Sequence, residues 1–527
     1  MSELTEELNK RLTFAIISHP DAGKTTITEK LLLFGGAIHM AGAVKSKRNS
    51  TKTTSDFMKM EQERGISIST SVMGFDYKGR EVRLLDTPGH ADFSEDTYRT
   101  LTAVDSALMV IDSVKGVEER TKTLCEITAM RATPVITYIN KMDREGREPI
   151  ELLDEIEEEL KIKACPLSWP IGQGQQFKGV YSIYENRIIL FNPRETLDTS
   201  SEVVEITDIN DSALDDAIGE TLAKRLREEL ELVCGVYPEF DKDEYLKAKI
   251  TPVFFGSAIN NFGVRELIDS MVDIAPEPLP RATESRIVSP DEDKFTGLIF
   301  KIHANLNPRH RDRIAFMRIN SGIFERNKAY THVRSGKTYK AANPTAFMAQ
   351  DREIIDKAFP GDIIGLHDTG TFKIGDVITE GEKLQFTGIP NFAPSIFRIA
   401  QNKDPLKSKQ FDQGLQHLTE EGVAQVFYKV STKERIIGVV GPLQLEVIQY
   451  RLDNEYKAKC NFIPVEYIGA CWVSSSNKEQ LNKFEKFFYS HLAKDKTDKL
   501  VYMYSNKWVF ERTKEEYPEL TFATTSD

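Results

Sequence analysis

The sequence is poor in cysteine and contains no long apolar run. Its five cysteines are widely spaced and form no C-x-x-C pair, which argues against a disulfide framework and a zinc ribbon. The nine histidines include no H-E-x-x-H or comparable spacing, so zinc is not expected. Apolar runs such as residues 107–111 are far shorter than the roughly 18 residues of a membrane span. We therefore expect buried cysteines and no membrane partner.

An excess of positive charge is also lacking. The chain has 69 Lys and Arg against 81 Asp and Glu, a net charge of −12, so it has no global attraction for nucleic acid and no DNA partner is expected. Any RNA must meet local basic patches, of which there are three: Lys45, Lys47, Arg48 and Lys52; Arg309, Arg311 and Arg313; Lys403, Lys407 and Lys409. The N-terminus is acidic where a secretory signal is basic and then apolar, which predicts a cytoplasmic protein.

Strand-type and helix-type patterns alternate over the first 280 of the 527 residues. Strands are predicted at residues 13–18, 67–77, 81–86, 107–111, 135–139 and 253–255, and helices at 24–34, 120–130, 150–160 and 264–274. The alternation predicts an open α/β sheet. The stretch between Asp143 and Gly256 is longer than one helix needs, so we expect an inserted subdomain at about 162–250, β-rich at first and helical over 214–233.

The pattern changes after residue 280. Residues 275–281 contain three prolines and read as a linker, and the short β-type runs with glycine turns over 295–381 predict a β-barrel. From about residue 386 helical and strand patterns mix again, with helices expected at 404–421 and 442–454, and no internal repeat is visible. Phe484, Phe487, Phe488 and Leu492 fall at helical spacing, which predicts core residues.

A phosphate-binding turn is predicted between the first strand and the first long helix. It comprises Ser18, His19, Pro20, Asp21, Ala22, Gly23, Lys24, Thr25 and Thr26. Backbone N–H groups at a helix N-terminus can face phosphate oxygens, Lys24 can reach the β- and γ-phosphates, and the Thr25 hydroxyl can bind Mg²⁺. Ser18 stands where the P-loop pattern has a glycine, so an ordinary turn remains an alternative.

Two further motifs follow predicted strands. The first is Asp86, Thr87, Pro88, Gly89 and His90, in which Asp86 can hold Mg²⁺ through water and the Gly89 N–H can sense a γ-phosphate. The second is Asn140, Lys141, Met142 and Asp143, in which the Asp143 carboxylate can accept the two N–H groups that distinguish guanine from adenine.

A further short segment, Ser257 and Ala258, completes the set of nucleotide motifs. After the last strand of the sheet, the Ala258 N–H can donate to guanine O6 while Ser257 supports the loop. Each motif alone also fits an ordinary turn. Together, in this order and at the strand ends where α/β sheets bind ligands, they favour a site for GTP or GDP.

With these residues identified, the chain resembles the translational GTPases, and among them the class II, release factor 3 family of bacterial peptide chain release factors. The resemblance rests on residues 19–26, 64–71, 86–90, 140–143 and 438–447. It implies a GTP-binding domain over 1–280, a translation-factor β-barrel over 281–385, and a C-terminal α+β domain with a ferredoxin-like part over 386–527. It also implies Mg²⁺ bound by Thr25, Ser67 and Asp86, a switch at residues 45–54, and His90 orienting the attacking water beside ribosomal RNA.

The implied function is termination of translation. Such a protein binds the ribosome after peptide release, stimulates dissociation of the class I release factor indirectly through the ribosome, hydrolyses GTP and leaves. Three alternatives stay open: an elongation factor G-like GTPase, the GTPase subunit of a sulfate-activating enzyme, and a nucleotide-gated scaffold. The first needs further C-terminal domains, for which too few residues follow Asn454.

Overall fold

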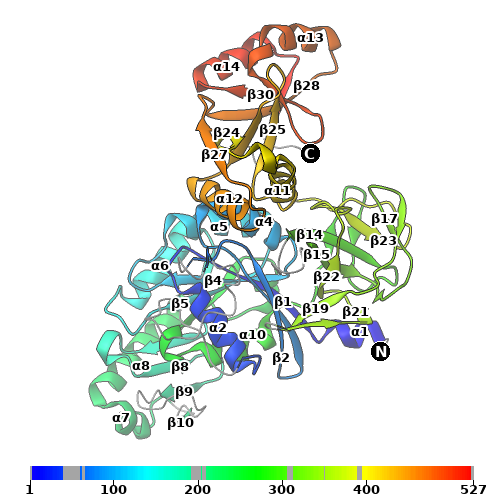
Figure 1. Cartoon of the computed structure of the whole chain (residues 1–527). Coiled ribbons are helices and arrows are strands. Elements are labelled where there is room, and N and C mark those ends of the chain that lie inside the picture. Colours follow the sequence, from blue (N-terminus) through cyan, green and yellow to red (C-terminus); the bar gives the residue numbers. More distant parts are fainter. Residues whose placement is uncertain are drawn as a thin grey trace.

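The structure is a computed structural model (Figure 1). It describes residues 3–38, 60–61, 66–190, 203–204, 209–304, 313–348, 351–388 and 394–523. The predicted switch at 45–54, Arg64, Arg309 and Arg311 lie outside the described residues. Within the described ranges, no helix is both long and apolar enough to cross a membrane.

A seven-stranded sheet of order β2-β3-β1-β4-β5-β11-β6 forms the N-terminal part. Its strands are β1 (Arg11–Ser18), β2 (Ser71–Tyr77), β3 (Arg80–Asp86), β4 (Ser106–Asp112), β5 (Val135–Asn140), β6 (Lys163–Pro166) and β11 (Ile250–Phe255). All neighbours pair in parallel except β2, which forms an antiparallel hairpin with β3. The predicted α/β sheet is confirmed, and the carboxyl ends of its parallel strands lie at one edge.

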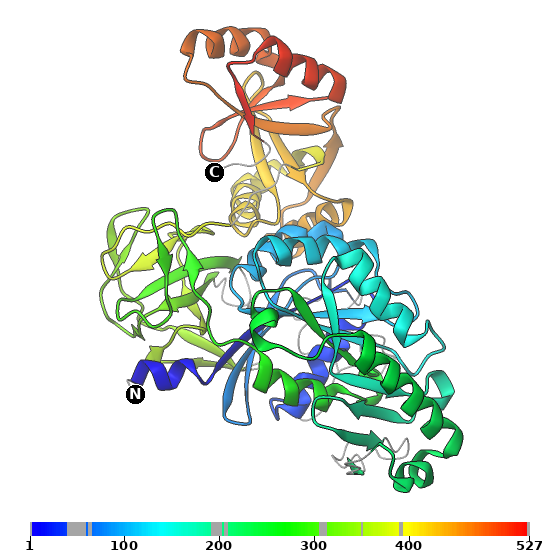
Figure 2. The same ribbon diagram turned by 180° about the vertical axis from the view of Figure 1, so that it is seen from behind.

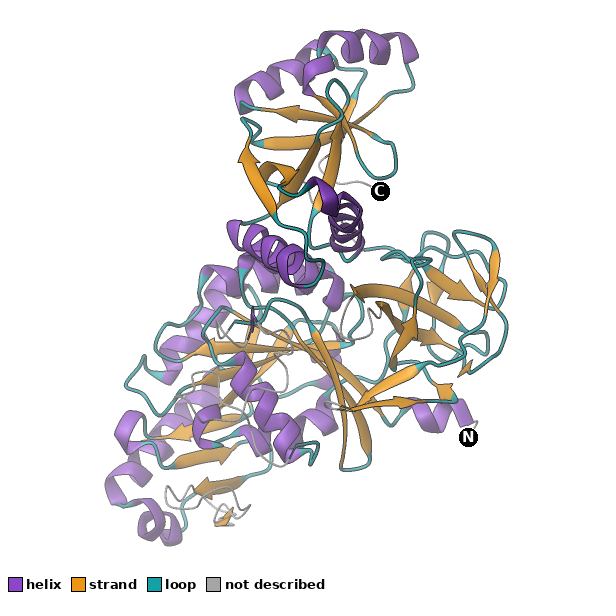
Figure 3. Ribbon diagram, in the orientation of Figure 1, coloured by secondary structure: helices purple, strands orange, loops and turns teal. Residues whose placement is uncertain are grey.

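Helices cover both faces of this sheet (Figure 3). They are α2 (Lys24–Phe34), α4 (Ser94–Leu101), α5 (Glu119–Met130), α6 (Pro149–Leu160) and α10 (Val264–Ile274), with 3-10 turns η1 (Ala91–Phe93) and η3 (Ala258–Asn260). Helix α1 (Glu3–Leu8) instead packs against Phe359 in the β-rich part of the chain. The side chains of β1 alternate between two cores. Ile16 packs with α2 and α10, and Ile17 packs with α5 and α6. Burial on both faces explains why these strands read as continuous apolar runs.

The inserted segment carries its own small sheet. Strands β7 (Ser168–Ile171), β8 (Gly179–Ser182), β9 (Arg187–Leu190) and β10 (Val203–Val204) are antiparallel, with η2 (Gly174–Gln176) between β7 and β8. Helices α7 (Ser212–Ile218), α8 (Glu220–Val236) and α9 (Lys242–Leu246) follow. The helical pattern predicted over 214–233 is confirmed, but as two helices, because Gly219 has a φ of 91° and separates α7 from α8. The sequence predicts that the insertion begins at about residue 162. Strand β6 (Lys163–Pro166) still pairs with β11 in the large sheet, so the small sheet begins only after β6.

The next region is almost entirely β-structure. Its strands are β12 (Arg281–Ala282), β13 (Ile287–Val288), β14 (Thr296–Ala304), β15 (Arg313–Ser321), β16 (Phe324–Glu325), β17 (Tyr330–His332), β18 (Lys337–Tyr339), β19 (Thr345–Met348), β20 (Asp351–Ile354), β21 (Lys357–Ala358), β22 (Ile363–His367) and β23 (Val377–Thr379). The eight-stranded sheet curls around one core that contains Phe295, Phe324 and Tyr330. Arg313 is buried and pairs with Asp368 at 2.7 Å, so it is a structural residue and not part of an exposed basic patch.

The C-terminal region contains the βαββαβ connectivity twice. The first unit is β24 (Ile396–Asn402), α11 (Ser408–Glu420), β25 (Gln425–Lys429), β26 (Arg435–Val439), α12 (Pro442–Asn454) and β27 (Cys460–Pro464), with η4 (Pro405–Lys407) before α11. The second is β28 (Gly469–Ser474), α13 (Lys478–Phe487), β29 (Leu492–Lys494), β30 (Leu500–Tyr504), α14 (Lys507–Glu516) and β31 (Thr521–Ala523), with η5 (Tyr489–His491) before β29. Each unit has the ferredoxin-like connectivity, and β25 pairs with β29 to join them into one sheet. The topology thus repeats although the sequence shows no repeat.

Two burial predictions are wrong in part. Cys234 is exposed, whereas the other four cysteines are buried and all five are free thiols. Phe487 is 74% exposed, whereas Phe484, Phe488 and Leu492 belong to the core. The helix ends at Phe487, so the helical spacing that groups the four residues does not continue through Phe488 and Leu492.

The β-rich region lies beside the large sheet, as the view from behind in Figure 2 also shows, and buried polar contacts attach the two. Arg318 pairs with Asp105 at 2.6 Å with both side chains 1% exposed, and Arg11 pairs with Asp362 at 3.0 Å. The Thr13 hydroxyl donates to the Gly361 carbonyl at 2.7 Å. Because a buried charge without its partner is costly, these pairs favour one arrangement of the two regions.

Candidate active site

The turn between β1 and α2 has the backbone shape of a phosphate-binding loop. Asp21 and Gly23 have left-handed φ values of 66° and 103°, and α2 begins at Lys24. A Cβ on Gly23 would lie 2.2 Å from Nδ2 of Asn140, so this position admits only glycine. The N-cap residue of α2 is Gly23, which has no side chain to cap the helix, so the N-terminal N–H groups are suited to an anion.

Lys24 and Asp86 form a buried ion pair beside this turn. Their side chains are 6% and 1% exposed, and Nζ of Lys24 contacts Oδ1 of Asp86. The Thr87 hydroxyl donates to the Ile16 carbonyl at 2.6 Å and fixes the end of β3 against β1. The structure thus brings the first two sequence motifs together.

Three oxygen-bearing side chains lie where a divalent cation is expected. The hydroxyl oxygens of Thr25 and Ser67 are 3.4 Å apart, and Asp86 contributes the carboxylate at the end of β3. Two hydroxyls and one carboxylate are hard ligands of the kind that Mg²⁺ binds together with phosphates and water. The set therefore fits Mg²⁺. No cluster of three His, Cys, Asp or Glu side chains able to hold a metal occurs among the residues that the structure describes.

Two histidines flank the phosphate end. The position of a Cβ on Gly89 would be 3.4 Å from Cα of Pro20, so the chain before His90 approaches the phosphate loop closely. The His90 side chain is 43% exposed, and its Nδ1 lies 3.4 Å from Oδ1 of Asp92. His19 contacts Glu118 at 3.3 Å, and its burial lowers the pKa of the imidazole. Of the two histidines, His90 is the more accessible to water.

Short hydrogen bonds connect the residues predicted to bind the base. Asn140 donates from Nδ2 to the Ala22 carbonyl and accepts the Ala258 N–H with Oδ1, both at 2.9 Å. Ser257 donates to Asp143 at 2.5 Å. The Ala258 N–H therefore already donates to Asn140. To donate to guanine O6 as well, it would have to form a bifurcated hydrogen bond. Met142 is fully buried, so its side chain belongs to the core.

Sequence reasoning missed two residues next to this end of the site. Asp112 pairs with Lys141 at 2.6 Å, and Lys141 also donates to the Asp21 carbonyl at 2.5 Å. Ser113 donates to the Lys141 carbonyl at 3.0 Å. Both residues stand at the carboxyl end of β4, where an α/β sheet binds ligands, and that position was the available signal.

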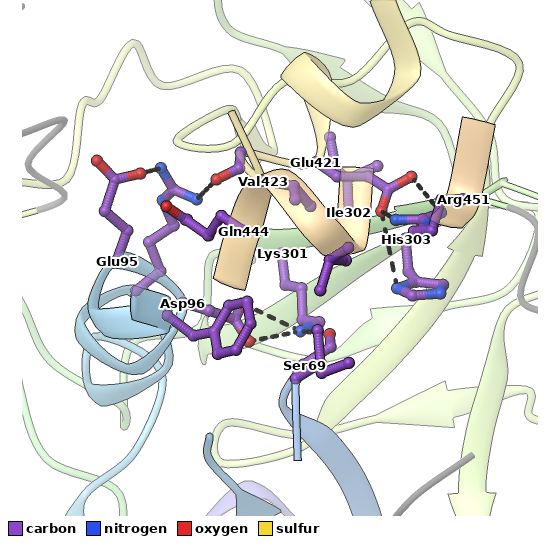
Figure 4. Close-up of a pocket in the computed structure, with 15 residues that line it drawn as sticks. Ser69, Glu95, Asp96, Lys301, Ile302, His303, Glu421, Val423, Gln444 and Arg451 are labelled. Carbon is purple, nitrogen blue, oxygen red and sulfur yellow. Dashed lines mark hydrogen bonds and ion pairs between the residues drawn. The ribbon is translucent and has the colours of Figure 1, made fainter. Parts of the chain in front are cut away.

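A second group of residues that the sequence did not predict lies where the three regions meet (Figure 4). A cavity of about 40 Å³ lies between the segment after Ser67, helix α4, strand β14 and helix α12. Lys301 on β14 donates to Ser69 at 2.6 Å and to both carboxylate oxygens of Asp96 at 3.0 Å. Asp96 in turn accepts the Thr70 N–H at 2.6 Å. Burial acts to raise the pKa of Asp96, but Lys301 and the Thr70 N–H outweigh it and hold that pKa below its usual range.

On the other side of the cavity a buried ion pair of the C-terminal region contacts strand β14 of the β-rich region. Arg451 on α12 contacts Glu421 at 2.6 Å, and Glu421 accepts the Ala304 N–H at 3.1 Å. Burial raises the pKa of Glu421. Arg99 on α4 pairs with Glu95 and donates to the Gly422 carbonyl at 3.3 Å. The helix that follows His90 is thus in contact with both later regions.

Comparison with known families agrees with this division of the chain. Residues 9–277 match the model of the elongation factor Tu GTP binding domain, residues 294–381 match elongation factor G domain 2, and residues 386–514 match the C-terminal domain of class II release factor RF3. A crystal structure of a protein from Thermus thermophilus superimposes with a TM-score of 0.71. It is 20% identical, over 89% of this chain and 71% of that one, and this likeness supports the fold.

These matches confirm the fold class and the GTPase activity predicted from the motifs, and GTPase domains of this kind imply guanine-nucleotide binding and a ribosome partner. The match over 386–514 favours the release factor over the alternatives of elongation factor G or a sulfate-activating subunit. The chain belongs to the family with the elongation factor Tu GTP binding domain, and it is a translation-factor GTPase of the release factor 3 kind.

Proposed function

We propose that this GTPase acts at the end of translation, where it binds the ribosome after peptide release and promotes dissociation of the class I release factor. The observation that carries the proposal is the junction around Lys301 and Asp96 (Figure 4). It joins the phosphate end of a GTP site to a β-barrel and to a C-terminal region of release factor type. A change at the γ-phosphate can therefore change the relative positions of the surfaces that face the ribosome.

The residues of the base end select guanine. Asp143 offers carboxylate oxygens to the N1–H and the exocyclic N–H₂ of guanine, and Ser257 orients that carboxylate. Asn140 fixes the Ala22 carbonyl and the Ala258 N–H, so the phosphate loop and the base loop are held together. Adenine lacks the donors that Asp143 requires.

The residues of the phosphate end hold and cleave the triphosphate. Lys24 and the N-terminus of α2 neutralise the β- and γ-phosphates. Thr25, Ser67 and Asp86 would hold Mg²⁺, which neutralises charge that develops on the phosphate oxygens. His90 orients the attacking water, and the Gly89 N–H binds the γ-phosphate. No arginine finger lies in the sequence motifs, so we expect slow hydrolysis until the ribosome positions His90.

Loss of the γ-phosphate has a defined route to the rest of the chain. Ser67 and Gly89 each lose a partner, and Ser69 and Thr70 follow Ser67 after one intervening residue, Ile68. These two residues contact Lys301 and Asp96, so their release weakens the contact with β14. We expect the GDP form to leave the ribosome by this route.

The test is turnover of a class I release factor on terminated ribosomes, with this protein plus GTP, with a nonhydrolysable GTP analogue, or without nucleotide. We expect multiple turnovers only with the protein and GTP. His90→Ala should still bind GTP and ribosomes but hydrolyse GTP about 10²-fold more slowly, the scale for losing a positioning group. Release-factor turnover that does not depend on the protein would contradict the proposed function. Undiminished hydrolysis by His90→Ala would remove the role of His90.

A further inference from the structure

Asp92 lies between the proposed catalytic histidine and the C-terminal region. It belongs to η1, two residues after His90, and its side chain is 12% exposed. Oδ1 lies 3.4 Å from Nδ1 of His90, and Oδ2 accepts the backbone N–H of Leu443 at 2.7 Å. Leu443 is the second residue of α12. One carboxylate thus contacts both His90 and the start of a helix from another region.

The loop before α12 fits closely around this carboxylate. A Cβ on Gly441 would lie 2.0 Å from Cγ of Asp92, so any larger residue at this position would displace the side chain. Gln444 accepts the N–H groups of Val440 and Gly441 at 2.7 and 3.3 Å, which fixes the loop. The positive N-terminal end of α12 also favours a carboxylate at this point.

Apolar packing holds the same two elements together. Phe93 follows Asp92 in η1 and is buried in a cluster with Val447 on α12 and Ile68 of the segment after Ser67. The position of α12 is therefore linked to both segments that surround the phosphate end of the site.

We propose that Asp92 is a positioning residue for His90, and that α12 keeps it in place through the Leu443 N–H. This inference rests on the proposed role of His90. Nδ1 of His90 makes no hydrogen bond in the part of the chain that the structure describes, and the Asp92 carboxylate, 3.4 Å away, is placed to orient the ring. When a carboxylate accepts Nδ1–H, the lone pair lies on Nε2 and can accept a proton from water. Catalytic contacts that are long without ligand commonly shorten in the reacting complex.

The first test is Asp92→Asn, which retains the shape of the side chain. An amide N–H₂ facing Nδ1 favours the opposite tautomer of His90. We expect kcat of ribosome-stimulated hydrolysis to fall about 10-fold or more, with GTP affinity and the KM for ribosomes unchanged. In a His90→Ala background the same substitution should have no further effect, because no imidazole remains to be oriented.

A matched pair of variants tests the contact from α12. Leu443→Pro removes the N–H that Asp92 accepts at a position in the first helical turn where proline is tolerated. Leu443→Ala removes most of the side chain and keeps the N–H. We expect the proline variant to lower kcat as Asp92→Asn does, and the alanine variant to remain within about threefold of the wild type.

The outcomes separate this inference from the proposed function. A kcat unchanged in Asp92→Asn, or a loss that persists in the His90→Ala background, would show that Asp92 has only a structural role. Undiminished hydrolysis by His90→Ala would instead overturn the role of His90 itself. If Leu443→Pro does not fold, the cycle of Asp92→Asn and His90→Ala still decides the question.

Discussion

The two ends of the nucleotide site are built in different ways. The base end is closed within the N-terminal region, where Asn140, Asp143, Ser257 and Ala258 form hydrogen bonds of 2.5–2.9 Å. At the phosphate end the hydroxyls of Thr25 and Ser67 are 3.4 Å apart. The segments around the phosphate end, after Ser67 and after His90, are held by contacts from other regions of the chain.

Those outside contacts come from two later parts of the chain. Lys301 on β14 binds Ser69 and Asp96, and Leu443 on α12 binds Asp92. The difference indicates a division of labour in which one region alone recognises guanine, whereas the whole chain controls hydrolysis.

The largest expected effect concerns the base end. Asp143→Asn replaces one acceptor with an N–H₂ donor, which then faces the donors of guanine, but matches the O2 and N1–H of xanthine. We expect GTP binding to weaken and xanthosine triphosphate to bind well, with a change in discrimination of about 10⁴-fold. Competition binding with GTP, ATP and xanthosine triphosphate measures it.

A matched control is Asp412→Asn, which makes the same chemical change at a half-exposed residue of α11. It should leave nucleotide preference unchanged. If Asp143→Asn still prefers GTP to xanthosine triphosphate, residues 140–143 do not recognise the base.

The next effect concerns the junction. Lys301→Met removes a buried cation whose partner, Asp96, is 20% exposed, so the cost should approach but not exceed the roughly 3–5 kcal/mol of a fully buried pair. We expect lower stability in urea unfolding and slower ribosome-stimulated hydrolysis, with GDP affinity within about twofold of the wild type because the base end is intact.

Lys328→Met is the control for the junction. Its cation is 39% exposed and pairs with Glu380 at 2.6 Å, so its loss should cost less than about 1 kcal/mol. Equal destabilisation by the two variants would show that Lys301 is an ordinary surface contact.

The smallest effect is the pH dependence of the same junction. Because the folded-state pKa of Asp96 is lowered, its contribution to stability is fully present above the unfolded value of about 3.9 and is lost as pH falls through the folded pKa. In Lys301→Met burial raises that pKa, so the variant takes up the proton at higher pH than the wild type. The stability difference should therefore shrink on acidification from pH 7 toward 4, by at most about 1.4 kcal/mol per pH unit. If the stability difference between the wild type and Lys301→Met grows on acidification, the ionised Asp96 carboxylate is not its source.

The elements around the phosphate loop and the predicted base loop could be placed from the sequence because their signals are local. Helix α2 begins and ends where the spacing of Ile27 and Leu31 predicts, and the glycine at 23 is required by a positive φ that a short motif encodes. Asn140 ends the recognisable apolar strand β5, and Asp143 follows it three residues later.

The junction was not predicted because its partners are distant in sequence. Asp96 and Lys301 are separated by more than 200 residues, and a lysine within a β-type run is usually an exposed charge. From the sequence, Asp92 is an ordinary polar residue near His90. Only the structure shows that it accepts the Leu443 N–H of α12. The second ferredoxin-like unit was missed for a related reason, since topology can repeat where sequence does not.

The most direct test of the division between the two ends is the rate at which Asp143→Asn hydrolyses xanthosine triphosphate on terminated ribosomes. If base recognition is separate from catalysis, its maximal rate should lie within about threefold of the wild-type rate with GTP, and adding Lys301→Met should lower both rates by the same factor. A variant that binds xanthosine triphosphate tightly but hydrolyses it 10-fold or more slowly would contradict this account, because the base end would then take part in hydrolysis.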